Sequence, residues 1–288
     1  MKEELDELVN QQVWELKVPP LGANILGGRW VYKIKTNNKG IPIRYKSRWV
    51  VQGFNQILGI DYLETFSTTV RPETFRLALV IAISLGYTVK QYDVKNAFIH
   101  AAIDTDIYVI QPVGFETTEN KVCKLNKALY GLKQSPRLWY KYLRDTLERF
   151  NFEVSPYDQA CFIHRGNKVV LYCHVDDFLV TGPSTKVIDL TISPLTSRLK
   201  LQDMGGISTF LGQEVNIDYN TKTFTIGQLK YTEQLLKRFK TGRIPTKPER
   251  AIDLVSPIDP TKRVKKTVRW TPNTCSRLQK ACLEPTKQ

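Results

Sequence analysis

Apolar residues recur along the chain with two different periods, which predicts a mixture of helices and strands. Recurrence every three to four residues indicates helices, some of them marked by a proline at the start or a glycine at the end. Pro72 and Gly86 bracket one such segment, and Pro194 interrupts another. The predicted helices cover residues 1–12, 73–85, 136–150, 185–201 and 228–239.

Short apolar runs and alternating patterns predict strands, most of them paired into hairpins. Turn-forming sequences separate neighbouring runs, namely NNKG at 37–40, GN at 166–167 and YNTK at 219–222. Hairpins without a repeating βαβ order predict an α+β fold, and the lack of a glycine-rich phosphate loop argues against a P-loop enzyme. The predicted strands cover residues 29–35, 44–53, 87–94, 107–110, 161–164, 168–175, 214–218 and 223–226.

The composition is that of an intracellular globular protein. The chain has 288 residues, of which 42% are hydrophobic, so it can bury a substantial core. Its five cysteines are odd in number and contain no CxxC pair, which is typical of reduced thiols. The most apolar run, residues 77–85, is too short to span a bilayer, and the acidic N-terminus carries no secretory signal. We therefore expect no membrane partner.

The net charge of +14 suggests a polyanionic partner, although much of this charge lies in one segment. Residues 237–288 hold 14 basic and 4 acidic residues, whereas residues 1–236 hold 28 and 24. Two acid-free strips carry more information than the total. Eight Lys and Arg lie between Glu15 and Asp61, and seven lie between Glu119 and Asp145. Solvated surface explains either strip alone, but two strips fit a track for a phosphate backbone better.

The candidate chemistry lies in three carboxylates at the ends of predicted strands. Asp176 and Asp177 stand inside an apolar stretch, LYCHVDDFLVTG, and Asp93 ends the run YTVKQYDV. Adjacent negative charges in such surroundings are costly unless a cation joins them, and hard divalent ions prefer carboxylate oxygens. Three such acids match the needs of two-metal phosphoryl transfer. Taken alone, the pair is more typical of a hairpin turn with two solvated acids.

A series of short motifs follows in order between about residues 3 and 239. They are RWVYKIKTNNKG, YKSRWVVQGFNQ, DYLETFSTTVRPETFRLAL, QYDVKNAFIHA, IYVIQPVGF, CKLNKALYGLKQSPRLWY, VDDFLVTG and FLGQEV. In this order and spacing they resemble the reverse transcriptase of copia-type LTR retrotransposons. The resemblance implies a right-hand polymerase with antiparallel palm hairpins. Its fingers would cover about residues 20–86 with part of 107–140, its palm would hold the three acids, and a partial thumb would begin near residue 228.

The same resemblance implies an RNA-directed DNA polymerase, a nucleotidyltransferase that extends a primer on an RNA or DNA template with dNTPs. Asp93, Asp176 and Asp177 match the catalytic acids. Together with the Val94 carbonyl they would hold two Mg²⁺ ions, for which Mn²⁺ can substitute. Such domains are normally linked to ribonuclease H and integrase domains, which are absent from this sequence.

Five further residues match the nucleotide-binding positions of the family. Phe98 stands where the family has an aromatic gate against the ribose 2′-hydroxyl, although core packing explains it as well. Lys46 and Arg48 match positions that hold the triphosphate, with a solvated strand edge as the alternative. Tyr130 and Gly131 would line the same pocket. His174 departs from the family, which usually has a tyrosine before VDD.

The sequence suggests three parts. Residues 1–20 form a helical lead-in, residues 21–240 the reverse transcriptase, and residues 241–288 a basic tail that is disordered or decayed. The whole is expected to be a polyprotein fragment, in the cytoplasm (in a virus-like particle) or the nucleus. Two rivals stand beside this interpretation. One is a catalytically inactive, element-derived protein that binds nucleic acid, and the other is an acid-lined metal-binding or structural domain.

Overall fold

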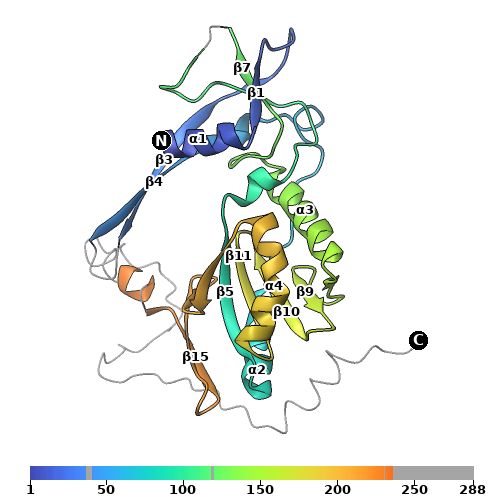
Figure 1. The fold of residues 1–288 in the computed structure, drawn as a ribbon. Coiled ribbons are helices and arrows are strands. Elements are labelled where there is room, and N and C mark those ends of the chain that lie inside the picture. Colours follow the sequence, from blue (N-terminus) through green and yellow to red (C-terminus); the bar gives the residue numbers. More distant parts are fainter. Residues whose placement is uncertain (37–40, 118–119, 230, 236–288) are drawn as a thin grey trace, which may run out of the picture.

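The computed structural model describes residues 1–36, 41–117, 120–229 and 231–235. Figure 1 shows two groups of elements stacked along the long axis, with α1 (Lys2–Asn10), β1 (Trp14–Lys17), β3 (Gly28–Thr36), β4 (Pro42–Val51) and β7 (Val122–Leu125) in the upper one. The lower group is built around a six-stranded sheet. The mixture of helices with mostly antiparallel sheet agrees with the predicted α+β class.

The six-stranded sheet has the strand order β12-β5-β11-β10-β9-β8 and is antiparallel throughout. The neighbouring strands β5 and β11 carry Asp93 and Asp177, and Asp176 immediately precedes β11. Both β10 and β11 are apolar on consecutive residues because each face of the sheet is covered, as expected for doubly buried strands. The bounds are β12 (Leu201–Gly206), β5 (Thr88–Val94), β11 (Asp177–Gly182), β10 (Val169–His174), β9 (Cys161–His164) and β8 (Glu153–Val154).

Helices pack on both faces of this sheet, and the alternation of side chains along β11 decides which core each residue enters. Phe178 and Val180 join the cluster formed with α3 (Ser135–Arg149) and α4 (Thr185–Leu199). Leu179 points the other way, into the cluster formed with α2 (Pro72–Leu85) and the small sheet of β13 (Thr209–Phe210), β14 (Gln213–Asp218) and β15 (Thr223–Gly227). The sheet is therefore held rigidly between two apolar layers.

The upper group has its own core. A four-stranded sheet of order β1-β7-β6-β2 includes β6 (Tyr108–Val109) and β2 (Ile25–Leu26), and β3 pairs with β4 as a separate two-stranded ribbon. Leu8 of α1, Trp49 and Val51 of β4 and Leu129 pack together in this third cluster. Two short 3-10 helices, η1 (Gly53–Asn55) and η2 (Ala97–His100), complete the described elements.

Most predicted elements are present. The predicted helices in the first 201 residues correspond to α1–α4, and the hairpins around GN and YNTK are β9–β10 and β14–β15. The NNKG turn and residues 241–288 lie outside the described residues, as do residues 236–239 of the last predicted helix. The cysteines that the structure describes, Cys123, Cys161 and Cys173, are buried, and none of the three is in a disulfide. Among the described residues, no helix is long and apolar enough to cross a membrane.

Two predicted boundaries are wrong. The segment 185–201 does not stay helical to its end, because Lys200 adopts a left-handed conformation with φ 49° and Leu201 pairs with Val94 as the first residue of β12. The strand predicted over 44–53 ends at Val51, and Gly53 begins η1. The strands β1, β2, β7, β8, β12 and β13 were not predicted.

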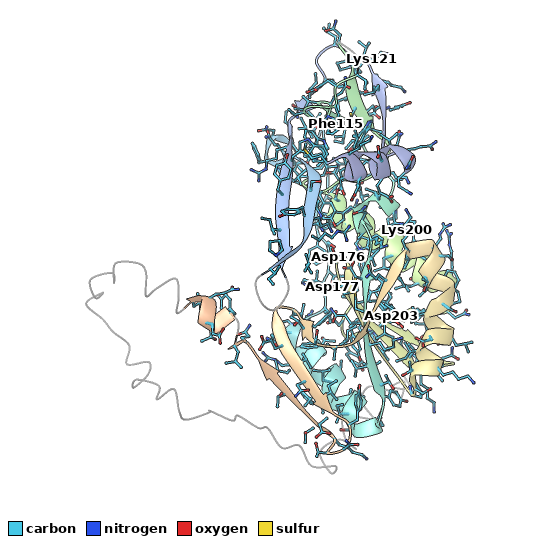
Figure 2. All side chains as sticks on the ribbon, turned by 60° about the vertical axis from the view of Figure 1, so that its left-hand side comes forward. Phe115, Lys121, Asp176, Asp177, Lys200 and Asp203 are labelled. Carbon is cyan, nitrogen blue, oxygen red and sulfur yellow. The ribbon has the colours of Figure 1, made fainter. Side chains whose placement is uncertain are left out.

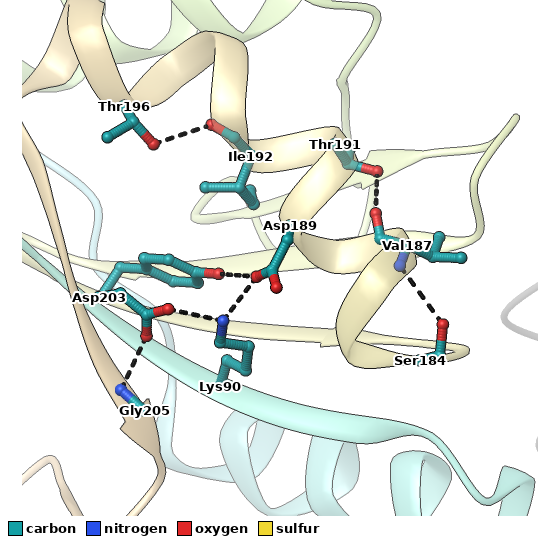
Figure 3. A network of polar contacts seen from close by, with 10 residues as sticks. Lys90, Ser184, Val187, Asp189, Thr191, Ile192, Thr196, Asp203 and Gly205 are labelled. Carbon is teal, nitrogen blue, oxygen red and sulfur yellow. Dashed lines mark hydrogen bonds and ion pairs between the residues drawn. The ribbon is translucent and has the colours of Figure 1, made fainter.

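An ion-pair network centred on the buried Lys90 joins three elements of the lower group (Figure 3). Lys90 of β5 lies with its ammonium 2.5 Å from Asp189 of α4 and 2.6 Å from Asp203 of β12. The Tyr92 hydroxyl donates to Asp189 at 3.2 Å. Burial alone would lower the pKa of Lys90, but the two carboxylates outweigh it and raise that pKa. The network therefore clamps α4 and the edge strand β12 to the centre of the sheet.

We predict that Lys90→Met lowers the free energy of unfolding by about 2 kcal/mol, because it leaves two part-buried carboxylates without their cation. Although burial acts to raise the pKa of Asp203, hydrogen bonds from Lys90 and Gly205 lower it overall. A lowered pKa stabilises the fold above the unfolded pKa of about 3.9, and this stabilisation is lost as the pH falls through the folded pKa. Urea unfolding at pH 7 and pH 3 should therefore show a gap between Lys90→Met and wild type that narrows in acid. An equal gap at both pH values would contradict the assignment.

Candidate active site

The three acids meet at one end of the β5–β11 pair. Asp177, the first residue of β11, lies directly opposite Asp93 in the antiparallel register, and the Val94 amide donates to the Asp176 carbonyl at 2.8 Å. All three side chains are half-buried. Figure 2 shows Asp176 and Asp177 at the level where the upper group meets the sheet. The structure thus brings together acids that are more than 80 residues apart in the sequence.

The turn that carries Asp176 has an unusual backbone. β10 and β11 pair up to His174 and Asp177, so Val175 and Asp176 form the two-residue connection. Val175 has φ 60°, in the left-handed region that β-branched residues avoid. Such strain persists only where the surroundings fix it, and it is concentrated at functional sites. The sequence alone gave no indication of it.

The electrostatics of the cluster favour a cation. Burial raises the pKa of Asp177, and the negative charges of Asp176 and Asp93 raise it further. The nearby His174 and a hydrogen bond from Gln91 act to lower this pKa, but burial and the two neighbouring carboxylates outweigh them. The fold therefore holds concentrated negative charge at a site that is only partly hydrated.

The donor set suits a hard divalent ion, because carboxylate and carbonyl oxygens are the ligands that Mg²⁺ and Mn²⁺ prefer. The arrangement is not that of a closed metal centre. Across the described residues, no three His, Cys, Asp or Glu side chains converge closely enough to hold an ion. Open coordination is the usual state of a site whose metals arrive with a phosphorylated substrate, since Mg²⁺ keeps part of its coordination for phosphate and water.

An aromatic and cationic group lies beside the acids. The Arg48 guanidinium stacks over the Tyr130 ring at 4.8 Å, and the Tyr130 ring meets Phe98 edge-on at a centroid distance of 4.6 Å. Burial raises the pKa of Tyr130 to about 12, with Asp176 as the next largest contribution. The negative charge of the acid cluster therefore acts on the Tyr130 hydroxyl. Arg48, Tyr130 and Phe98, from three separate motifs, form one continuous group.

Arg48 carries a buried donor without a partner in the described part of the chain. Its Nε atom is buried and has no hydrogen-bond partner among the described residues. An unpaired buried donor of a charged group is costly, and such atoms commonly mark a place where a ligand binds. Lys46 lies two residues earlier on the same face of β4, directly opposite Lys33 of β3.

Gly131 is required where the two groups of elements touch. Its φ is 97°, and a Cβ atom there would lie 2.0 Å from the Val51 carbonyl oxygen. The Val51 amide donates to the Tyr130 carbonyl at 2.9 Å, so the end of β4 is hydrogen-bonded to the Tyr130–Gly131 backbone. Only glycine combines this backbone conformation with this approach. The role that the structure shows for Gly131 is to join the Arg48 strand to the Tyr130 loop.

One residue near the site was not predicted. Glu4 of α1 is half-buried, and burial raises its pKa while Lys46 and Arg48 lower it. On the same helix, Glu7 forms an ion pair with Lys200 at 2.8 Å, which connects α1 to the lower group. The acidic N-terminus predicted a helix, but nothing in its pattern indicated that Glu4 faces the basic residues of β4.

Comparison with known proteins identifies the family. The family model for reverse transcriptase (RNA-dependent DNA polymerase) matches residues 11–248. The chain is 37% identical over 254 residues to the "Retrovirus-related Pol polyprotein from transposon RE1" of Arabidopsis thaliana, covering 86% of this chain and 17% of the relative. It is 36% identical over 245 residues to the corresponding polyprotein from transposon TNT 1-94 of Nicotiana tabacum, covering 83% and 18%.

The chain therefore belongs to the reverse transcriptase (RNA-dependent DNA polymerase) family, and it is similar to the polymerase segment of copia-type Pol polyproteins. The resemblance predicted from the motifs is confirmed. The chain spans less than a fifth of the length of these relatives.

A solved structure of a foamy viral protease-reverse transcriptase in complex with ds DNA aligns with 85% of this chain and 36% of that chain, at 14% identity and a TM-score of 0.42. That similarity is too low to support an argument about the fold.

We predict that Asp177→Asn raises the melting temperature of the protein at pH 7 in EDTA. A raised carboxyl pKa means that the folded state disfavours the charged form, so the charge destabilises the fold above the unfolded pKa of about 3.9. The difference from wild type should vanish as the pH falls below this value. Asp145→Asn, an exposed acid on α3, is the matched control and should change nothing. A lower melting temperature for Asp177→Asn would show that this carboxylate stabilises the fold.

Proposed function

We propose that this chain is the RNA-directed DNA polymerase of a copia-type retrotransposon, folded as a right hand with fingers, palm and partial thumb. The observation that carries the proposal is the meeting of Asp93, Asp176 and Asp177 beside the Arg48–Tyr130–Phe98 group. Acids for metal-assisted phosphoryl transfer and a cationic pocket for a nucleotide lie next to each other. In this proposal the six-stranded sheet is the palm and the β3–β4 ribbon belongs to the fingers.

The acids would hold two divalent ions, with the Val94 carbonyl as an additional ligand. Bound there, such ions lower the pKa of an attacking hydroxyl and neutralise charge on the leaving pyrophosphate. Asp93 and Asp176 would be the direct ligands, and Asp177 would add negative charge that keeps the ions in place. The β5–β11 register keeps these carboxylates at a fixed separation, so binding requires little rearrangement of the backbone.

The neighbouring residues would bind the incoming dNTP. Arg48 offers a planar fork with an unpaired buried Nε, which suits bidentate binding of a triphosphate, and Lys46 adds a point charge on the same face. Stacking on Tyr130 orients the guanidinium, and Gly131 holds the Tyr130 backbone against β4. Phe98 would lie beneath the sugar. Phe98 is 8% exposed, and its ring meets the Tyr130 ring edge-on, which would put it beside the bound nucleotide.

The template and primer would follow the two acid-free basic strips. Their lysines and arginines release counterions when they bind phosphates, so binding should depend steeply on salt and little on sequence. Base pairing would supply sequence choice. Linkage to ribonuclease H and integrase domains is proposed by analogy with the Pol polyproteins that the chain resembles.

A catalytically inactive nucleic-acid-binding protein is the second candidate. The observation that favours it is His174 beside the acids, where the family usually has a tyrosine. The retention of all three carboxylates favours the enzyme. Primer extension with poly(rA) template, oligo(dT) primer and Mg²⁺ separates the two, because only the enzyme lengthens the primer.

We predict that Asp176→Asn lowers the rate of primer extension at least about 100-fold, the scale of losing one electrostatic contact to a reacting centre. Binding of primer-template, measured by fluorescence anisotropy, should stay within about twofold, because the basic strips are unchanged. Asp145→Asn is again the control for a lost surface charge. Extension at the wild-type rate by Asp176→Asn would refute the two-metal assignment.

We predict that Phe98→Ala raises the efficiency of rNTP incorporation relative to dNTP by about 10–200-fold, the range available from steric discrimination in a pocket. The ratio is the quantity to measure, because loss of a buried ring also costs stability and lowers both rates. Ile99→Ala is the matched control, since Ile99 is buried in the same short helix but packs into the core of the upper group. If both variants leave the ratio unchanged, Phe98 serves the core alone.

A further inference from the structure

The strained turn before the acids has a specific anchor. The indole N–H of Trp139 on α3 donates to the Val175 carbonyl oxygen at 2.8 Å. Trp139 is 2% exposed, and this hydrogen bond uses the only polar atom of its side chain. The Cys173 thiol lies 3.6 Å from the same oxygen, which is a much weaker interaction. A helix that is remote in sequence thus holds the peptide between Val175 and Asp176.

The two carbonyls of the turn are fixed from opposite sides. The Val175 oxygen accepts from Trp139, and the Asp176 oxygen accepts from the Val94 amide of β5. Rotation of either peptide would swing the Asp176 side chain away from Asp93. Because Val175 has φ 60°, the free turn would relax toward negative φ, and an external restraint is needed to oppose that relaxation.

Trp139 is itself well placed to act as a restraint. Its ring packs near those of His100 and Tyr142, at centroid distances of 5.8 and 6.1 Å. The helix begins at Ser135, whose buried hydroxyl donates to the Leu129 carbonyl at 2.6 Å, one residue before Tyr130. The anchor of the acid turn therefore lies on the same rigid helix that follows the nucleotide loop.

We propose that Trp139 is a positioning residue, whose indole N–H holds the Val175 peptide so that Asp176 and Asp177 are presented to the metal ions. This inference rests on the proposed function. A purely apolar role for Trp139 needs the ring but not the N–H. A positioning role needs the N–H, and the N–H matters only while the backbone of residue 175 is strained.

The first experiment removes the donor. Trp139→Phe keeps an aromatic ring without the N–H, and replacement of Trp139 by 3-benzothienylalanine keeps both the shape and the size. We expect Mn²⁺ binding to the protein without nucleotide, measured by calorimetry, to weaken about 10–100-fold, as is typical when an outer partner of a metal ligand is lost. On poly(rA)/oligo(dT), kcat should fall by a similar factor while KM for dTTP changes less than about twofold.

The control lies on the same helix. Tyr140→Phe deletes one hydrogen bond from α3, from the Tyr140 hydroxyl to the Gln159 carbonyl at 2.9 Å, which does not involve the turn. It should leave Mn²⁺ affinity and kcat unchanged. Melting temperatures show whether each variant is folded. Should Trp139→Phe unfold, the benzothienyl variant decides the matter, since it leaves no cavity.

The second experiment removes the strain. Glycine adopts φ 60° without steric cost, so Val175→Gly should make the turn less dependent on its anchor. We expect the loss of Mn²⁺ affinity caused by Trp139→Phe to be at least fivefold smaller in the Val175→Gly background, a coupling that a merely structural tryptophan would not show. Equal losses in the two backgrounds, or wild-type Mn²⁺ affinity in a folded variant lacking the N–H, would overturn the proposal.

Failure of the enzyme assignment gives a different pattern. If wild type extends no primer but binds Mn²⁺ through Asp176, the polymerase activity is refuted. The Mn²⁺ affinities measured by calorimetry still test the role of Trp139. If Asp176→Asn leaves Mn²⁺ binding unchanged, the metal site and the positioning role are both overturned.

Discussion

The pairing of β5 with β11 is the interaction on which the site depends, because its register places Asp93 opposite Asp177 and ties Val94 to Asp176. Negative charges held together in this way repel one another, and burial makes the repulsion stronger. The sheet tolerates them because both of its faces are buried, by α3 and α4 on one side and α2 on the other. Apolar burial thus offsets the cost of bringing these negative charges together, the usual relation between stability and function.

A second constraint joins the Arg48–Tyr130–Phe98 group to the acids. The backbone contact between Val51 and Tyr130 requires glycine at position 131, and it fixes the Arg48 strand relative to the loop that precedes α3. Trp139, a few residues later on α3, donates its indole N–H to the Val175 carbonyl in the turn before the acids. The helix therefore gives both halves of the site one rigid support, which is how catalytic groups are kept within a fraction of an ångström of a working geometry.

The sequence predicted what depends on local pattern. Apolar periodicity, Pro72 and Gly86 were enough for the main helices and hairpins, and the ordered motifs identified the family and the acids. It did not predict features that arise from contacts distant in sequence. Leu201 looks helical until its pairing with Val94 is known, and Trp139 looks like an ordinary core residue until its acceptor is known. The grouping of Arg48, Tyr130 and Phe98 likewise came from the fold, since the motifs name these residues without showing that their side chains touch.

The clearest conflict between local preference and structure occurs at Val175, and its location is informative. A valine favours extended backbone, and glycine or asparagine would form this turn at lower cost. Sequences that fold well agree with their structure locally, so a disagreement beside three acids marks a place where geometry matters more than stability. A stiff β-branched residue held by a buried indole has few alternative conformations once the anchor is made. Glycine would relieve the strain, so the turn would depend less on the indole. Strain and anchor together therefore hold the Val175–Asp176 turn in one conformation.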